Sequence, residues 1–241
     1  MPEVIFNGPA GRLEGRYFHN NEPKAPVALV LHPHPLHGGT MNNKVSYNIF
    51  KTFVDNGFSV LRFNFRGVGK SQGKYDEGIG ELTDATIAMD WLQTQNPGAN
   101  IYWVGGFSFG SWITMQLLMR RPEIMGFITV SPPANNYDFS FLSPCAVSGL
   151  ILQGSKDTIV PEEYPAKLAD KLAAQKNIEI DYHVIEGADH FFRDKIDEVS
   201  DVLHNYVSKR ITIDKDIVSK RRVGKRRRKS RKSKLNIETQ D

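Results

Sequence analysis

The feature that most constrains the fold is the alternation of short apolar runs with segments of helical periodicity. Val27–Leu31 is apolar at every position, which is typical of a strand buried on both faces of a parallel sheet. Between such runs, apolar residues recur every three or four positions, as in Val45, Ile49 and Phe53, and this spacing predicts amphipathic helices. Strands that alternate with helices imply right-handed crossovers and a mostly parallel sheet with helices on both faces.

The expected elements fill most of the chain. Val4–Phe6 and Leu13–Phe18 flank the turn-rich sequence NGPAG and predict an N-terminal antiparallel hairpin. Further strands are expected at 27–31, 58–63, 101–104, 127–130, 149–152 and 178–184, and helices at 45–56, 82–92, 109–120, 166–175 and 195–208. A chain of 241 residues is comfortable for one such domain with a sizeable core. We therefore predict a single α/β domain over residues 1–210.

Charge divides the chain into two regions. From Lys220 to Lys234, 11 of the 15 residues are Lys or Arg, and none is aromatic. Such a block cannot bury a core, so we predict that residues 211–241 form a basic, disordered tail. Its clustered cations suit non-specific contact with nucleic acid or an anionic surface, or they serve only to solubilise the chain.

Several features bear on cellular location. No apolar run approaches the roughly 18 residues that a membrane span needs. The N-terminus has neither a basic nor an apolar signal-peptide region. Cys145 is the one cysteine, so no internal disulfide is possible, which fits a reducing compartment. We expect a cytoplasmic protein without a membrane span, and the sequence leaves its oligomeric state open.

A serine between two glycines marks a candidate nucleophile. Gly106-Phe107-Ser108-Phe109-Gly110 matches G-x-S-x-G, between the strand at 101–104 and the helix at 109–120. In this turn the serine is strained, and the flanking glycines avoid collisions. The pattern alone recurs by chance, but its position at a strand-to-helix junction makes it informative. It predicts Ser108 as a nucleophile.

Two further candidates follow later strands. Asp157 lies in GSKD after the strand at 149–152, and His190 lies in GADHFF after the strand at 178–184. The carboxyl ends of parallel strands meet at one edge of a sheet, so these side chains can converge with Ser108. We expect His190 to accept the proton of Ser108 and Asp157 to orient His190. The alternative for Asp157 is a helix N-cap.

The order Ser, Asp, His resembles that of the α/β-hydrolase superfamily, over roughly residues 1–210. His32-Pro33-His34-Pro35, Gly38-Gly39-Thr40-Met41 and Asn43-Lys44 resemble a group of small bacterial hydrolases similar to dienelactone hydrolases and to the catalytic domains of Xaa-Pro peptidases. Phe65–Ser71 is similar to the R-G-x-G-x-S turn of the superfamily. The resemblance implies the α/β-hydrolase fold and a serine hydrolase activity, but no particular substrate.

The resemblance also indicates where an oxyanion hole would lie. The main-chain N–H of Phe109, at the positive end of the following helix, is expected to supply one donor. The second donor should come from the loop after Leu31. Pro33 and Pro35 have no N–H, which leaves the main-chain N–H groups of His32 and His34. The register of the turn favours His34, so we expect this donor to be the N–H of His34.

Other residues near these positions have weaker interpretations. Phe107, Trp112 and Phe191 are candidates for an apolar substrate pocket, with ordinary core packing as the alternative. The histidines of the 32–37 run suggest a metal site, but no Asp or Cys ligand is nearby, so we expect neither metal nor cofactor. Residues 131–147 are too few for a lid domain. We therefore expect no cap and an open site suited to small-molecule acyl substrates.

The sequence thus predicts a metal-independent serine hydrolase that cleaves a carboxylic ester or related acyl bond through an acyl-enzyme. Two alternatives remain. One is a serine peptidase of the Xaa-Pro or aminopeptidase type, which would need an acidic anchor for the substrate amine. The other is a non-catalytic scaffold with the same fold that docks through its basic tail.

Overall fold

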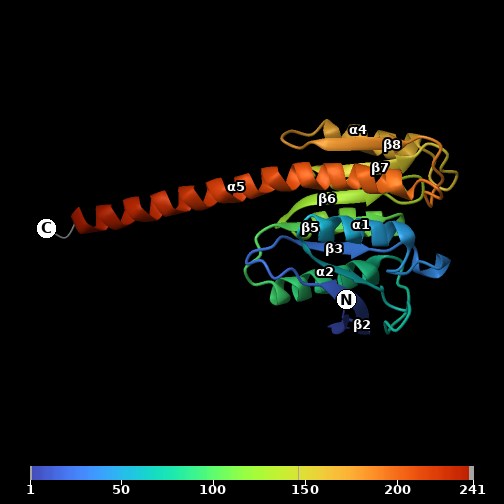
Figure 1. Ribbon diagram of the computed structural model, residues 1–241, viewed down its shortest axis with the longest axis horizontal. Coiled ribbons are helices and arrows are strands. Elements are labelled where there is room, and N and C mark those ends of the chain that lie inside the picture. Colours follow the sequence, from blue (N-terminus) through green and yellow to red (C-terminus); the bar gives the residue numbers. More distant parts are fainter. Residues whose placement is uncertain (1, 146, 239–241) are drawn as a thin grey trace.

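The computed structural model describes residues 2–145 and 147–238, with side chains up to Lys220. In these residues eight strands form one sheet, in the order β1-β2-β4-β3-β5-β6-β7-β8 (Figure 1). The strands are β1 (Glu3–Gly8), β2 (Gly11–Phe18), β3 (Val27–Leu31), β4 (Ser59–Phe63), β5 (Tyr102–Phe107), β6 (Ile124–Val130), β7 (Gly149–Gly154) and β8 (Ile180–Ile185). Every strand expected from the sequence is present, with shifts of a few residues at its ends.

The sheet is mostly parallel. β1 pairs antiparallel with β2, and β2 pairs antiparallel with β4, which confirms the N-terminal hairpin. All the other pairs are parallel. β3 lies between β4 and β5, with Leu29 opposite Leu61 on one side and Val104 on the other. The carboxyl ends of these central strands therefore meet at one edge of the sheet.

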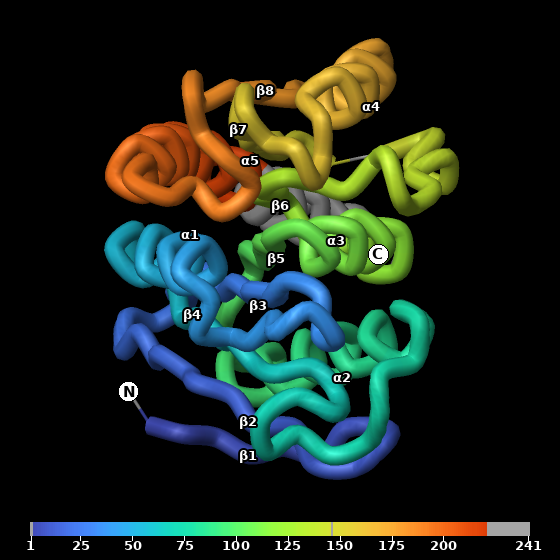
Figure 2. Tube along the Cα trace, turned by 90° about the vertical axis from the view of Figure 1, so that its right-hand side faces the viewer, coloured from blue at the N-terminus to red at the C-terminus, as the bar shows by residue number. Residues whose placement is uncertain are grey.

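Helices cover both faces. The α-helices are α1 (Lys44–Asp55), α2 (Ile79–Gln95), α3 (Phe109–Leu118), α4 (Glu163–Ala173) and α5 (Ile196–Glu238). α1 and α5 pack on one face, while α2, α3 and α4 pack on the other (Figure 2). Because each face is covered, the residues of β3 and β4 are buried whichever way they point. This is the α/β-hydrolase fold that the sequence predicts.

The C-terminal helix differs from the prediction. We expected a helix to end near 208 and the domain to end at 210, but α5 continues to Glu238. Ile211 is 5% exposed and Asp214 is fully buried, and Asp214 accepts a hydrogen bond of 2.9 Å from Nε1 of Trp103 in β5. The boundary predicted at 210 is therefore too early. A solvated tail from residue 221 stays a prediction, and residues 239–241 lie outside the described part of the chain.

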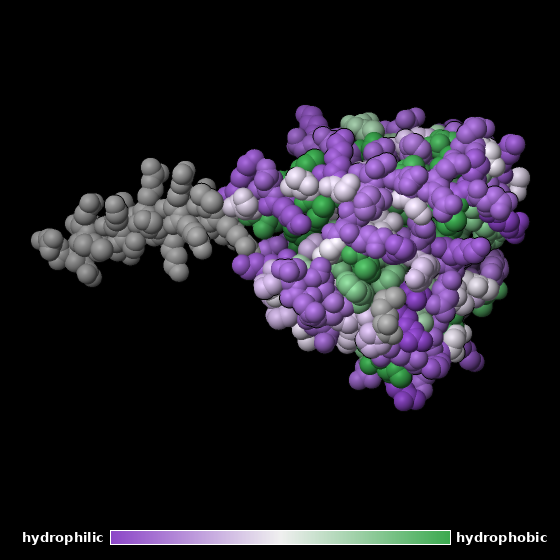
Figure 3. All heavy atoms as spheres, in the orientation of Figure 1, coloured by the Kyte–Doolittle hydropathy of each residue, from purple (hydrophilic) through white to green (hydrophobic). Residues whose placement is uncertain are grey.

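On the face seen in Figure 3, the surface of the domain is mainly hydrophilic, with small scattered hydrophobic patches. Within residues 2–145 and 147–238, no helix combines the length and the apolar character that crossing a membrane requires. α5 is the longest helix, but its mean hydropathy is low because its C-terminal half is rich in Lys and Arg.

Candidate active site

Ser108 lies at the turn between β5 and α3, where the backbone leaves the sheet. Its φ is 52° and its ψ is −120°, a conformation that is strained for a residue other than glycine and persists only where the surroundings enforce it. The N–H of Ser108 donates to the carbonyl of Val130 at 2.9 Å, which ties the turn to β6. Ser108 is half-buried at the carboxyl edge of the sheet.

The glycines on either side of Ser108 are required by close backbone contacts. A Cβ atom on Gly106 would overlap the carbonyl of Gly110. A Cβ atom on Gly110 would overlap the carbonyl oxygens of Leu31 and His32, the second at 2.6 Å. These are backbone atoms of packed elements and cannot move aside cheaply. The G-x-S-x-G pattern therefore allows α3 to begin directly against the end of β3.

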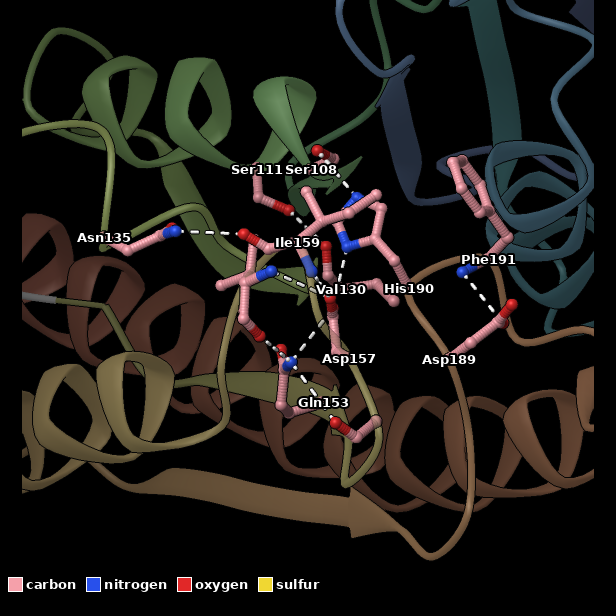
Figure 4. Close-up of polar contacts among 12 residues, drawn as sticks. Ser108, Ser111, Val130, Asn135, Gln153, Asp157, Ile159, Asp189, His190 and Phe191 are labelled. Carbon is pink, nitrogen blue, oxygen red and sulfur yellow. Dashed lines mark hydrogen bonds and ion pairs between the residues drawn. The ribbon is translucent and has the colours of Figure 1, made fainter.

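Ser108, His190 and Asp157 meet at this edge (Figure 4). Nε2 of His190 lies 3.1 Å from Oγ of Ser108, and Nδ1 of His190 lies 2.7 Å from Oδ2 of Asp157. A carboxylate can only accept, so the imidazole proton is on Nδ1 and Nε2 is left as an acceptor for the serine hydroxyl. The structure thus brings together the three side chains that the sequence singled out.

The carboxylate of Asp157 is held at both of its oxygens. Oδ1 accepts main-chain N–H groups from Ile159 at 2.9 Å and Val160 at 2.8 Å. Oδ2 accepts from Nε2 of Gln153 at 3.1 Å in addition to His190. Burial on its own raises the pKa of Asp157, but the bonds from His190 and from the main chain outweigh it and lower the pKa below the ordinary 3.8. Asp157 is therefore ionised at neutral pH.

The loop after β3 places His34 beside the start of α3. His34 has φ −54° and precedes the short 3₁₀-helix η1 (Pro35–His37). Its ring centroid lies 5.0 Å from that of Phe109. In the part of the chain that the structure describes, neither the main-chain N–H of His34 nor that of Phe109 donates to a protein acceptor. Both groups are free to bind an oxygen of a ligand.

His32 in the same loop is fully buried, and its contacts define its tautomer. Its Nε2 accepts the main-chain N–H of Phe65 at 3.0 Å. The ring proton is therefore on Nδ1, which donates to the carbonyl oxygen of Pro33 at 2.6 Å. Burial lowers the pKa of His32 to about 4, so the ring is neutral at neutral pH.

The remaining histidines of this run make local contacts. The rings of His34 and His37 stack with centroids 4.3 Å apart, and Nδ1 of His34 accepts the N–H of Leu36 at 3.2 Å. Among the described residues, no group of three His, Cys, Asp or Glu side chains is placed to hold a metal ion.

Two of the predicted pocket residues pack beside His190, with their own ring centroids 6.4 Å apart. Phe107 is fully buried, with its ring centroid 5.2 Å from that of His190, so it packs in the core beneath the imidazole. Phe191 is 41% exposed and lies at the same distance of 5.2 Å (Figure 4). A cavity of about 500 Å³ opens beside Phe191, with Lys44 and Arg193 in its wall. Phe191 therefore lines an open cavity next to His190, whereas Phe107 packs in the core; that Phe191 contacts a substrate stays a prediction.

Trp112 belongs to an aromatic cluster that includes two tyrosines missed by the sequence analysis. Its ring stacks on Tyr137 with centroids 4.3 Å apart. Tyr75 lies 4.9 Å from the ring of His34 and 6.1 Å from that of Phe109. Burial raises the pKa of Tyr75 to about 12, so its phenol is neutral. Both tyrosines lie in loops without periodicity, where only their aromatic character could have pointed to them.

Two buried carboxylates of α2 were also missed. Arg66, in the R-G-x-G-x-S turn, donates to Asp84 from Nε at 3.0 Å and from Nη2 at 2.7 Å. Glu81 accepts the main-chain N–H groups of Asp76 at 3.0 Å and Gly78 at 2.8 Å. Both carboxylates are fully buried. They fix the loop between β4 and α2, which carries Tyr75 to the site.

A short segment joins β6 to β7. It contains the 3₁₀-helix η2 (Ser140–Leu142) and has no room for a lid domain, as the sequence predicts. Nδ2 of Asn135 in this segment donates to the carbonyl of Ile159 at 2.9 Å (Figure 4). The segment is thereby tied to the loop that carries Asp157.

Comparison with known proteins agrees with this architecture. The model of a family described as the alpha/beta hydrolase fold matches residues 36–146. The solved structure of XC6422 from Xanthomonas campestris, a member of the α/β serine hydrolases without a lid, is 30% identical with a TM-score of 0.78. The match covers 86% of this chain and 94% of that protein. The chain belongs to the α/β-hydrolase superfamily.

Other members of the superfamily show how far the likeness extends. A protein of unknown function from Agrobacterium tumefaciens is 54% identical with a TM-score of 0.86, over 88% of this chain and 97% of that one. The lysophosphatidylserine lipase ABHD12 of Xenopus tropicalis is 23% identical, over 86% of this chain and 64% of that protein. The chain is therefore an α/β-hydrolase without a lid domain, and these comparisons do not identify its substrate.

Proposed function

We propose that this α/β-hydrolase is a serine hydrolase that cleaves carboxylic esters or related acyl bonds. Ser108 is the nucleophile, His190 the general base and acid, and Asp157 the carboxylate that orients His190. The observation that carries the proposal is the unbroken path from Oγ of Ser108 to Nε2 of His190, at 3.1 Å, and from Nδ1 of His190 to Oδ2 of Asp157, at 2.7 Å.

In the first half of the reaction, Oγ of Ser108 attacks the acyl carbon while Nε2 of His190 takes the hydroxyl proton. The carbonyl double bond opens, and its electron pair moves to the oxygen. Asp157 remains a carboxylate and stabilises the imidazolium that forms. When the tetrahedral intermediate collapses, His190 returns the proton to the leaving oxygen, and the acyl group stays on Ser108.

In the second half, water takes the place of the alcohol. His190 accepts a proton from the water, whose oxygen attacks the acyl carbon of the ester on Ser108. Collapse of the second intermediate breaks the bond to Oγ, and His190 returns the proton to Ser108. The products are the free acid and the original enzyme. The open edge without a lid gives water direct access to this step.

The main-chain N–H groups of His34 and Phe109 are proposed to bind the oxyanion of both intermediates. Each lacks a protein acceptor among the residues that the structure describes, and Phe109 is the first residue of α3, where the helix dipole adds positive potential. Removing one such donor costs about 10² to 10³ in kcat in well-studied enzymes. Both proposed donors are backbone groups, so substitutions other than proline leave them in place.

The substrate is proposed to be a small acyl compound with an apolar part. Phe191, next to His190, is 41% exposed, and Ile159, in the loop of Asp157, is 47% exposed. Both offer apolar contacts to a substrate beside Ser108. The segment between β6 and β7 is too short to enclose a long chain. The name of the ABHD12 relative adds one lipid class, lysophosphatidylserine, to the substrates worth assaying.

The deciding experiment is labelling with a fluorophosphonate probe, which reacts only with an activated serine. We expect the wild type to be labelled stoichiometrically and Ser108→Ala and His190→Ala to remain unlabelled. Ser208→Ala, an exposed serine of α5, is the matched control and should label like the wild type. A panel of short-chain ester, thioester, aminoacyl and lysophospholipid substrates then defines the class, with Ser108→Ala losing on the order of 10⁴-fold or more in turnover.

A folded wild type that is not labelled would overturn the proposal and favour the non-catalytic scaffold. Labelling without ester turnover, but with release of an N-terminal amino acid, would favour the peptidase instead. Circular dichroism of the wild type and of each variant separates a loss of activity from a loss of fold.

A further inference from the structure

In the loop between β3 and α1, residues 32–43, His32 is the one residue that is both fully buried and polar. Its side-chain hydrogen bonds among the described residues go to Pro33 and Phe65 rather than to Ser108, and the mechanism above does not use it. Its ring nevertheless makes two hydrogen bonds, to the carbonyl of Pro33 at 2.6 Å and from the N–H of Phe65 at 3.0 Å. Because both ring nitrogens are hydrogen-bonded in a buried place, the imidazole restrains the two backbone groups that it binds.

The carbonyl that His32 holds belongs to the peptide unit that also contains the N–H of His34. Ser143-Pro144 is the one cis peptide bond among the described residues, so the bond between Pro33 and His34 is trans. In a planar trans peptide the C=O and the N–H point in opposite directions. The direction of the His34 N–H is therefore set by the atom that binds the Pro33 carbonyl.

Sheet topology says which way each end of this peptide points. β3 lies between β4 and β5, and Phe65, which binds the ring of His32, follows the end of β4. The ring therefore lies on the β4 side and draws the Pro33 carbonyl toward that side. The N–H of His34 must then point toward β5, and Ser108 directly follows β5.

We propose that His32 is a positioning residue that aims the main-chain N–H of His34 at the oxyanion, by holding the carbonyl of Pro33 on the far side of the same peptide. The inference rests on the proposed function, because it assigns a role to His32 only if an oxyanion forms beside Ser108. Without the imidazole, rotation of this peptide would turn the N–H away and present a carbonyl oxygen to the developing negative charge.

Two neighbouring features fit this role. Gly39 packs so closely on Pro33 that a Cβ atom there would overlap the Pro33 carbonyl, so the carbonyl is confined from a second side. The next carbonyl, that of His34, accepts the N–H groups of His37 at 3.1 Å and Gly39 at 3.0 Å. The peptides on both sides of His34 are thus fixed. The low pKa of His32, about 4, keeps its Nε2 free to accept from Phe65 at working pH.

Two substitutions separate this role from general support of the fold. In His32→Asn, the amide can occupy the place of Nδ1 and still donate to the Pro33 carbonyl, but it cannot reach Phe65. In His32→Gln, the amide can occupy the place of Nε2 and accept from Phe65, but it releases the Pro33 carbonyl. Each variant loses one hydrogen bond, so a merely structural role predicts similar losses of kcat in both.

We expect His32→Gln to lose on the order of 10²-fold in kcat with little change in KM, and His32→Asn to keep most of its kcat despite a lower Tm. The assay is hydrolysis of the best ester from the substrate panel, with thermal melts of both variants. Equal losses of kcat, or a larger loss in His32→Asn, would overturn the inference.

A double-mutant cycle keeps the test decisive if either variant folds poorly. His34→Pro removes the N–H itself, and the His34 φ of −54° suits proline. If His32 acts only through that N–H, then His32→Gln should cause no further loss of kcat in the His34→Pro background. Additive losses would refute the inference. A wild type that fails fluorophosphonate labelling would instead refute the proposed function, so the two failures are distinguishable.

Discussion

Nδ1 of His190 lies 2.7 Å from one oxygen of Asp157, while the other oxygen of that carboxylate accepts two main-chain N–H groups from the loop that carries it. Asp157 is thus fixed by its own loop before it orients His190. The His190 ring in turn cannot rotate without breaking a buried bond. The geometry at Ser108 therefore depends on a loop conformation as much as on the three side chains.

Replacing Asp157 with Asn should separate geometry from charge. The amide preserves shape but favours the wrong tautomer of His190, so we expect kcat to fall by on the order of 10⁴-fold. Asp189→Asn is the control, because Asp189 pairs with the exposed Arg193 and not with His190. Steady-state ester hydrolysis measures both, and a loss below about tenfold in Asp157→Asn would contradict the assigned role.

Stability should respond to acid through the same carboxylate. The pKa of Asp157 is lower in the folded protein than its ordinary 3.8. Its ionised form therefore stabilises the fold above pH 3.8, and this contribution is lost as the pH falls through the lower, folded pKa. Denaturant unfolding of wild type and Asp157→Asn between pH 2 and 7 should show free energies of unfolding that converge at the acid end. A constant difference across that range would argue against this linkage.

The two main-chain donors predict a contrast between two substitutions at one position. His34→Ala keeps the N–H and should change kcat little, because the one hydrogen bond of the ring among the described residues is to the neighbouring Leu36 N–H. His34→Pro removes the donor and should lower kcat by about 10² to 10³. Similar kcat values for the two variants would mean that this N–H does not bind the oxyanion.

The ion pair of Arg66 and Asp84 should matter for stability more than any exposed pair. Asp84 is fully buried, so Arg66→Met leaves a buried carboxylate with the main-chain N–H of residue 66 but without its counter-charge, and we expect a loss of about 3–5 kcal/mol. Lys167→Met breaks the exposed pair with Glu163 and should cost about 1 kcal/mol or less. Urea unfolding compares them. Arg66→Met/Asp84→Leu should recover much of the loss, and no recovery would indicate that the loop needs the arginine for another reason.

Truncation of α5 should reveal where the folded domain ends. A chain that stops at Ser208 loses the burial of Ile211 and leaves Nε1 of Trp103 without Asp214, at a cost of about 3–5 kcal/mol. A chain that stops at Lys220 keeps both contacts and should melt like the full chain. Only the full chain should bind nucleic acid, with an affinity that falls steeply with salt. Equal binding by the chain that stops at Lys220 would exclude the basic segment as the contact.

The catalytic candidates were predictable because each follows a strand by only a few residues. Ser108 comes directly after β5, while Asp157 and His190 follow the ends of β7 and β8 by three and five residues, so the alternation of apolar runs indicates the edge at which they meet. For the second oxyanion donor, whose role stays a prediction, the missing N–H groups of Pro33 and Pro35 left His32 and His34, and the register of the turn favoured His34. Local rules sufficed for these residues, since short turns leave little freedom in where a side chain lies.

Residues whose role depends on a distant partner could not be predicted in this way. Asp84 and Glu81 lie on α2, where an acid normally faces solvent, and only the position of Arg66 and of the loop before α2 explains their burial. The burial of Asp214 could not be predicted either, because its partner Trp103 is 111 residues away in the sequence. The end of the domain was misplaced for this reason, since composition alone made α5 look like the start of a solvated tail.

Helix α5 begins beside the catalytic edge and runs out past the opposite side of the sheet (Figure 1). A partner bound at its basic end would therefore be held away from Ser108 by the full width of the domain. A partner bound there would leave the edge with Ser108 open. The protein would then act on compounds that diffuse to this edge rather than on the partner itself. If the basic segment makes the contact that its charge predicts, the location of the protein and the compounds it cleaves would be determined by separate parts of the chain.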